Sequence, residues 1–227
     1  MDVKDLLRRK KIKKDKRSLS LQEGTDLVAV EYEITTEKLS NKGFDKLPFK
    51  VRKQIEQLYE LLRSKPKQVI PSLLELIEKY PNVAVLYNYL IAAYRLSGQN
   101  EKADSMTVES YKRHPDYLFA KISYAFYCLR KGDPYKVPEI FDHKLELRQL
   151  YPHRKKFHIT EFINFMGLMA LYHNAIGERE IAIRYYDMIK QVDPNDNMVQ
   201  VLKKVLYPSF LARVLRKIIK KPLGNIT

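Results

Sequence analysis

A spacing of 34 residues recurs along this chain and constrains its fold more than any other feature of the sequence. Gly98 precedes Gly132 by this interval, and Pro81 precedes Pro115 by the same interval. The clearest copies of the unit end at Pro115 and Pro194. Self-similarity at a fixed interval of about 20 to 50 residues is typical of proteins that stack one small structural unit. The sequence therefore predicts a repeat architecture.

The copy that ends at Pro115 shows what each recurring residue does. Tyr87, Leu90 and Tyr94 lie three and four residues apart, so they form one apolar stripe on a helix. Gly98 follows this stripe and supplies the left-handed backbone at which helices end. A second helix can then lie close to the first at a small alanine, and the closing proline stops it. Each unit is therefore expected to be a pair of antiparallel helices.

This spacing resembles the tetratricopeptide repeat family, whose unit is two antiparallel helices in 34 residues. The copy that ends at Pro194 carries Ala182 at the family's position for a small residue. The middle copy is irregular, because Val137 replaces the usual alanine and Pro138 interrupts its second helix. The earliest unit lacks the family's small residue. The resemblance implies three to four repeats across residues 48–197.

We expect an all-α fold, an α-solenoid of three to four tetratricopeptide-like hairpins between an irregular N-terminal arm (1–47) and C-terminal helices (198–227). After Pro208, apolar residues recur at helical spacing with basic residues on the other face, which predicts an amphipathic helix. Two roles for this helix remain open. It caps the last hairpin, which the sequence favours, or it contacts an anionic membrane or a nucleic acid.

The net charge of +15 is concentrated at the two ends of the chain. Residues 1–17 hold nine Lys or Arg against three Asp, and residues 203–227 hold seven Lys or Arg and no acid. These ends suit nucleic acid, anionic lipid or an acidic protein, or they only improve solubility. A basic insertion lies between the second and third copies. Candidate anion-binding residues are Arg8, Arg9, Lys10, Lys11, Arg154, Lys155, Lys156, Arg213, Arg216 and Lys217.

Residues 27–35 differ from the rest of the chain, because their apolar residues alternate as in a strand. An all-helical fold offers a single strand no sheet to join. We therefore consider that this segment lies along the concave groove of its own solenoid and occludes it. The alternatives are that it packs over an edge of the solenoid or has no fixed structure.

Ligands of the tetratricopeptide family generally bind the concave face made by the first helix of each repeat, and the resemblance implies the same face here. Its residues are mostly apolar and aromatic with scattered amides, which favours a protein or peptide ligand with apolar anchors. The family's clamp for the carboxylate of a chaperone tail needs lysines at these positions, so we argue against that ligand. The predicted groove residues are Asn88, Ala92, Arg95, Phe119, Ile122, Phe126, Arg130, Asn164, Leu171 and Asn174.

The sequence offers little for catalysis. It contains no HExxH pair, no phosphate-binding loop and no GxSxG motif, so we expect neither an enzyme nor a metal, cofactor or small-molecule site. Cys128 is the single cysteine and falls at a packing position of the repeat. An internal disulfide is excluded, and we expect a reducing compartment, the cytoplasm.

Overall fold

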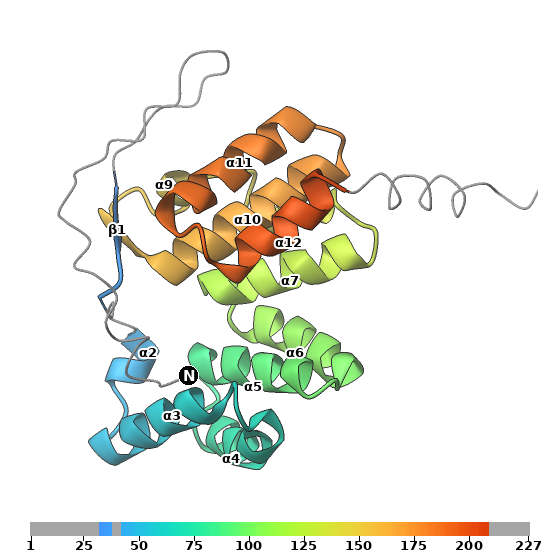
Figure 1. Cartoon of the computed structure of the whole chain (residues 1–227). Helices are drawn as coiled ribbons and strands as arrows, with labels where there is room; N and C mark the ends of the chain where they lie inside the picture. The colour runs from blue at the N-terminus through green and yellow to red at the C-terminus, as the bar shows by residue number, and fades with distance from the viewer. Residues whose placement is uncertain (1–31, 38–41, 209–227) are drawn as a thin grey trace, which may run out of the picture.

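The computed structural model describes residues 32–37 and 42–208. Helices account for 70% of these described residues. Eleven helices and two strands of three residues make up the described part (Figure 1). The all-α class that the sequence predicts is confirmed. None of the helices in these residues combines the length and the apolar character that crossing a lipid bilayer requires.

The N-terminal half consists of a short helix and two helical hairpins. The helices are α2 (Lys42–Asp45), α3 (Phe49–Leu61), α4 (Pro66–Lys79), α5 (Ala84–Leu96) and α6 (Asn100–Arg113). Pairs α3–α4 and α5–α6 are the hairpins. Because α5 packs against both α4 and α6, the two hairpins lie side by side.

The middle hairpin is shortened on its second helix. α7 (Leu118–Arg130) has full length, but α8 (Lys136–Ile140) has only five residues and contains Pro138. The second helix is short, as the irregular middle copy predicts, but Pro138 does not interrupt it. Pro138 lies in the first turn of α8, where backbone N–H groups have no partner within the helix. The helix ends only after Ile140, just before Asp142 and His143, which have positive φ angles. The chain then passes through α9 (Leu147–Leu150) and β2 (Lys156–His158) before the next hairpin.

The last hairpin is the longest, formed by α10 (Ile159–Ala175) and α11 (Arg179–Val192). α10 begins with a reciprocal cap, in which the His158 N–H donates to the Glu161 carboxylate at 2.9 Å and the His158 ring accepts from the Thr160 N–H. Such a cap satisfies backbone donors that the first helical turn leaves unpaired. It fixes where the chain leaves the insertion and enters α10.

α12 (Asn197–Leu206) covers the last hairpin and packs against both of its helices. Its buried residues are Val199, Leu202 and Leu206, and the Asp196 side chain accepts a hydrogen bond from the Met198 N–H at 2.7 Å at its start. The sequence predicts a capping structure at this place. The basic amphipathic helix predicted after Pro208 lies outside the described residues.

Three glycines end the first helix of successive hairpins. Gly98, Gly132 and Gly177 have positive φ angles of 78°, 83° and 91°, and follow the ends of α5, α7 and α10. Glycine adopts this left-handed backbone without steric cost, so the helix-ending role predicted for Gly98 is confirmed. Ala103 and Ala182 are completely buried where the second helix meets the first.

The strand predicted near the N-terminus exists but belongs to a sheet. β1 (Glu33–Thr35) pairs in parallel with β2, with Glu33 opposite Lys156, Ile34 opposite Phe157 and Thr35 opposite His158. The expectation that this segment has no strand to join is therefore wrong, because the insertion before α10 supplies one. Residues 27–31 of the predicted segment lie outside the described residues.

Side chains reinforce the pairing of β1 with β2. The Tyr32 ring lies 5.0 Å from the Phe157 ring and 6.4 Å from the Phe162 ring, both nearly edge to face. Glu33 forms an exposed ion pair with Lys156 at 3.1 Å. The pKa of Tyr32 is raised above its ordinary value, mainly by burial and to a smaller extent by the charge of Glu146. These contacts attach the N-terminal strand to the C-terminal half of the molecule.

The buried apolar side chains form two separate cores. One lies in the N-terminal half, from Phe44 to Ala103, and the other in the C-terminal half, from Leu118 to Leu206. The halves meet where α6 packs on α7, with the Tyr111 and Tyr124 rings stacked 4.5 Å apart. In Figure 1 the helices of the two cores are seen one above the other, with β1 and α2 at one side.

Candidate functional site

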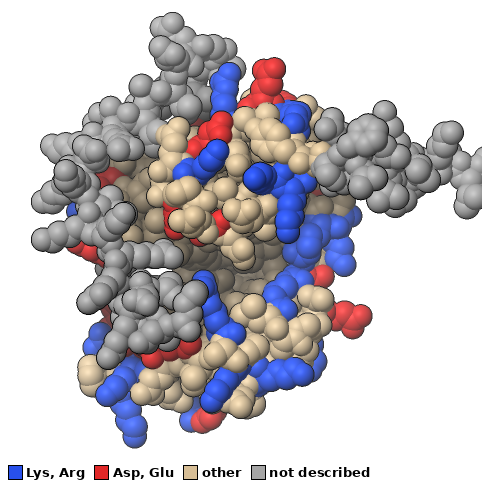
Figure 2. Space-filling model, in the orientation of Figure 1, with Lys and Arg blue, Asp and Glu red and all other residues tan. Residues whose placement is uncertain are grey.

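A groove opens between the two halves of the molecule and is lined by side chains from five helices, α5, α6, α7, α10 and α12. Its volume is about 530 Å³. Figure 2 shows this hollow, with Lys and Arg side chains gathered along one side of it. The groove has an apolar part and a cationic part.

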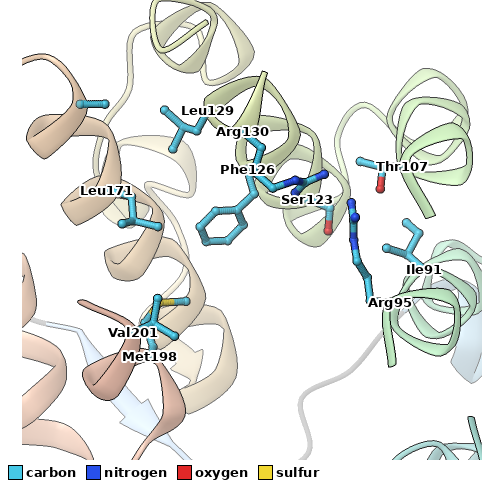
Figure 3. Close-up of a pocket in the computed structure, with 11 residues that line it drawn as sticks. Ile91, Arg95, Thr107, Ser123, Phe126, Leu129, Arg130, Leu171, Met198 and Val201 are labelled. Carbon is cyan, nitrogen blue, oxygen red and sulfur yellow. The ribbon is translucent and has the colours of Figure 1, made fainter. Parts of the chain in front are cut away.

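The apolar part lies between α7, α10 and α12. The Phe126 ring of α7 points towards Leu171 of α10, and Met198 and Val201 of α12 lie on the side next to Leu171 (Figure 3). Phe126, Leu171 and Met198 pack against the edge of the C-terminal core without being covered completely, and Val201 is 44% exposed. Apolar side chains that converge in a concave surface are typical of ligand-binding sites.

The cationic part surrounds one carboxylate. Asp104 Oδ1 accepts from Arg95 at 2.5 Å and from Arg130 at 2.6 Å, and Lys131 Nζ lies 3.6 Å from Asp104 Oδ2. Burial of Asp104 is the largest single influence on its pKa and raises it. The hydrogen bond from Arg95 and the nearby positive charges lower it. Their combined effect is larger than that of burial, so the pKa of Asp104 lies below its usual 3.8. Asp104 is therefore ionised at neutral pH.

Local sequence explains why these cations gather. Arg95 and Arg130 lie in the last turns of α5 and α7, where the partial negative charge of a helix C-terminus favours a cation. Lys131 follows α7 directly, and its Nζ lies 5.5 Å from the centre of the Tyr127 ring. Because Asp104 belongs to α6, the cluster also ties neighbouring hairpins together.

The structure brings four of the ten predicted groove residues together, namely Arg95, Phe126, Arg130 and Leu171. Ile122 is only 2% exposed and belongs to the C-terminal core, so it offers no surface to a ligand. The others are partly buried and do not line the groove. They are Asn88, Ala92, Phe119, Asn164 and Asn174.

Several residues that line the groove were not predicted from the sequence. Met198 and Val201 fall within the C-terminal helices expected at 198–227 and are not among the predicted groove residues, but α12 forms a wall of the groove. Ser123 lines the groove one helical turn before Phe126 and Tyr127. The regular spacing of apolar residues in 198–205 gave a signal for α12, whereas nothing local singled out Ser123.

The basic insertion is largely paired within the protein. Arg154 donates to both carboxylate oxygens of Glu161, at 3.1 and 2.6 Å, and lies 4.3 Å from the centre of the Phe157 ring. Lys156 pairs with Glu33, and Lys155 is exposed. Two of the three candidate anion-binding residues here therefore already have acidic partners. The candidates at the chain ends, residues 8–11 and 213–217, lie outside the described residues.

The described residues hold no group of three His, Cys, Asp or Glu that could bind a metal ion. Cys128 is free and buried, and burial is the main cause that raises the pKa of its thiol, so the reactive thiolate is disfavoured. Comparisons with protein families, with curated proteins and with solved structures found no match.

Proposed function

We propose that this chain is a non-enzymatic interaction module, a solenoid of tetratricopeptide-like hairpins that binds a peptide or a segment of a partner protein. The 34-residue interval supports the repeat, together with the left-handed Gly98, Gly132 and Gly177 that end the first helices. We place the module in the cytoplasm, because its single cysteine is free and buried.

The observation that carries this proposal is the composition of the groove. Five helices contribute to its lining, and Phe126, Leu171 and Val201 leave apolar surface open in its centre. An extended or helical segment with apolar side chains can cover this surface and exclude water from it. A chemical reaction has no comparable support, since the residues that line the groove are arginines, hydroxyls and apolar side chains, and the carboxylate beside them, Asp104, is held by Arg95 and Arg130.

Affinity capture with the full chain tests this function. We expect wild-type protein to retain a reproducible set of partner proteins from a cell lysate, and Phe126→Ser to lose them because it removes the central apolar contact. Tyr135→Ser is the matched control, since Tyr135 is an aromatic residue 74% exposed outside the groove. Equal retention by wild type and Phe126→Ser would contradict binding in the groove.

A second candidate function rests on the charge of the chain ends. Residues 1–17 and 203–227 carry nearly all of the net charge of +15, which suits nucleic acid or an anionic membrane surface with the helices as a scaffold. Affinity for RNA or DNA that falls steeply with salt, and that disappears on deletion of 1–17 or 209–221, would support this function. Unchanged binding after both deletions would reject it.

A further inference from the structure

The cationic part of the groove carries more positive charge than its carboxylate can balance. Arg95, Arg130 and Lys131 share Asp104, so three positive charges face one negative charge. The side chains of Arg130 and Lys131 remain 45% and 58% exposed. By contrast, the guanidinium of Arg154 in the basic insertion has a carboxylate of its own, since it donates to both oxygens of Glu161. The cluster around Asp104 therefore keeps donors and charge for a further anion.

This excess charge lies directly beside the apolar part of the groove. Phe126 and Arg130 are four residues apart on α7, so they lie on one face of the helix and are separated by about 5 to 6 Å along it. Figure 3 shows the Phe126 ring pointing towards Leu171, while Arg130 points towards the side of Arg95. The Ser123 hydroxyl lies between the two arginines in this view.

An extended peptide matches this arrangement. Alternate side chains of a strand lie on the same face, about 6.5 to 7 Å apart. An apolar side chain placed on Phe126 therefore brings the side chain two residues away to the level of Arg130. A carboxylate at that second position meets both guanidinium groups, and the apolar residue is covered by Leu171 and Val201.

We propose that the groove binds an extended acidic peptide in which Asp or Glu lies two residues from a large apolar residue. The carboxylate lies between Arg95 and Arg130, and the apolar side chain lies against Phe126. This inference rests on the proposed function and adds the chemistry of the partner. A nucleic acid fits less well, since its phosphates repeat at close intervals, whereas Leu171, Met198 and Val201 extend the groove without a charge.

Selection from a library of short random peptides displayed on phage tests the proposal with the full chain. We expect the enriched peptides to share Asp or Glu two positions from Leu, Ile, Phe or Met. Affinities of synthetic peptides from this pool are then measured by calorimetry. The double variant R95Q/R130Q should lower the affinity about ten- to a hundred-fold, because two charge-assisted hydrogen-bonding groups are lost. R113Q is the matched control, since Arg113 is an exposed arginine of α6 paired with Glu109 away from the groove.

The Asp104→Asn variant distinguishes loss of the anion site from loss of folding. It is expected to raise the affinity, whereas R95Q/R130Q should lower it. Removal of the competing carboxylate should raise the affinity for the acidic peptides about three- to five-fold. Unchanged or lower affinity would overturn the anion site. Enriched peptides that are apolar but not acidic would overturn it while leaving the groove function intact. The absence of any peptide that depends on Phe126 would overturn both.

Discussion

At the scale of single residues, the partly buried His114 links the stability of the fold to pH. Its ring lies 4.9 Å from the Tyr87 ring, and its Nε2 atom has no hydrogen-bond partner among the described residues. Burial is the main cause that lowers the pKa of His114 below its ordinary 6.5, and the charge of Arg113 lowers it further. A hydrogen bond to Pro81 opposes both. The folded protein therefore favours the neutral ring.

This lowered pKa predicts loss of stability in mild acid. Below about pH 6.5 the unfolded chain binds a proton at His114 before the folded chain does, so the free energy of unfolding falls as the pH decreases towards the folded pKa. Each unit of lowering corresponds to about 1.4 kcal/mol. Urea unfolding at about pH 7.5 and about pH 5.5 should show a smaller loss in His114→Phe than in wild type. His153→Phe serves as an exposed control, and identical losses in all three proteins would refute the prediction.

Residues also differ in how far their roles follow from the sequence alone. Gly98 and Ala103 were predictable, because a left-handed helix end and a close helix crossing each require one kind of side chain at one place. Ile122 was not, since an apolar residue on a helix suits both a core and a groove. In the structure Ile122 belongs to the C-terminal core, where α7 packs against α10.

At the scale of elements, Gly167 of α10 lies against the side chain of Met198 in α12, so the lack of a side chain at Gly167 leaves room for α12. A Cβ atom at Gly167 would lie 2.7 to 2.8 Å from the Met198 side chain. Gly167→Ala should therefore lower the free energy of unfolding by about 1 kcal/mol through overpacking. In a Met198→Ala background the same change should raise it by up to about 1 kcal/mol, because alanine is the better helix former. Chemical denaturation of the four proteins measures this coupling, and equal effects in both backgrounds would contradict it.

The pairing of β1 with β2 gives a second prediction at this scale. Tyr32→Ala removes ring contacts with Phe157 and Phe162 and should cost about 2 kcal/mol, less than the ~3–5 kcal/mol of a fully buried aromatic. The Glu33 N–H, which donates to the Lys155 carbonyl at 2.9 Å, should then exchange its hydrogen faster. The control Glu33→Gln removes only an exposed ion pair and should cost less than about 1 kcal/mol. Unchanged exchange in Tyr32→Ala would argue against this role.

At the scale of the whole molecule, the two cores predict uneven stability. Leu73 is completely buried in the N-terminal core, and Met169 in the C-terminal core. Leu73→Ala should cost about 2–5 kcal/mol and lower hydrogen-exchange protection more in α3–α6 than in α10–α12. Met169→Ala should show the reverse distribution. Equal loss of protection across both halves in either variant would mean that the molecule opens as one unit.

The global arrangement was only partly predictable. Helices and their ends follow from local spacing, and α5–α6 and α10–α11 both form from neighbouring residues. The sheet between β1 and β2 and the cluster around Asp104 combine residues from separate units. Their formation depends on how the hairpins are placed in space, which the spacing within one unit does not specify.

The sheet also sets an order of events as the chain folds. The hairpins need only neighbouring residues, but the side chains of Glu33 and Lys156 meet across 123 positions of sequence. Contacts between distant positions form slowly, because a long loop must close before they add stability. On a ribosome, the N-terminal strand has no partner until residues 156–158 have been synthesised. β1, the first of the described elements, is therefore among the last to reach its place.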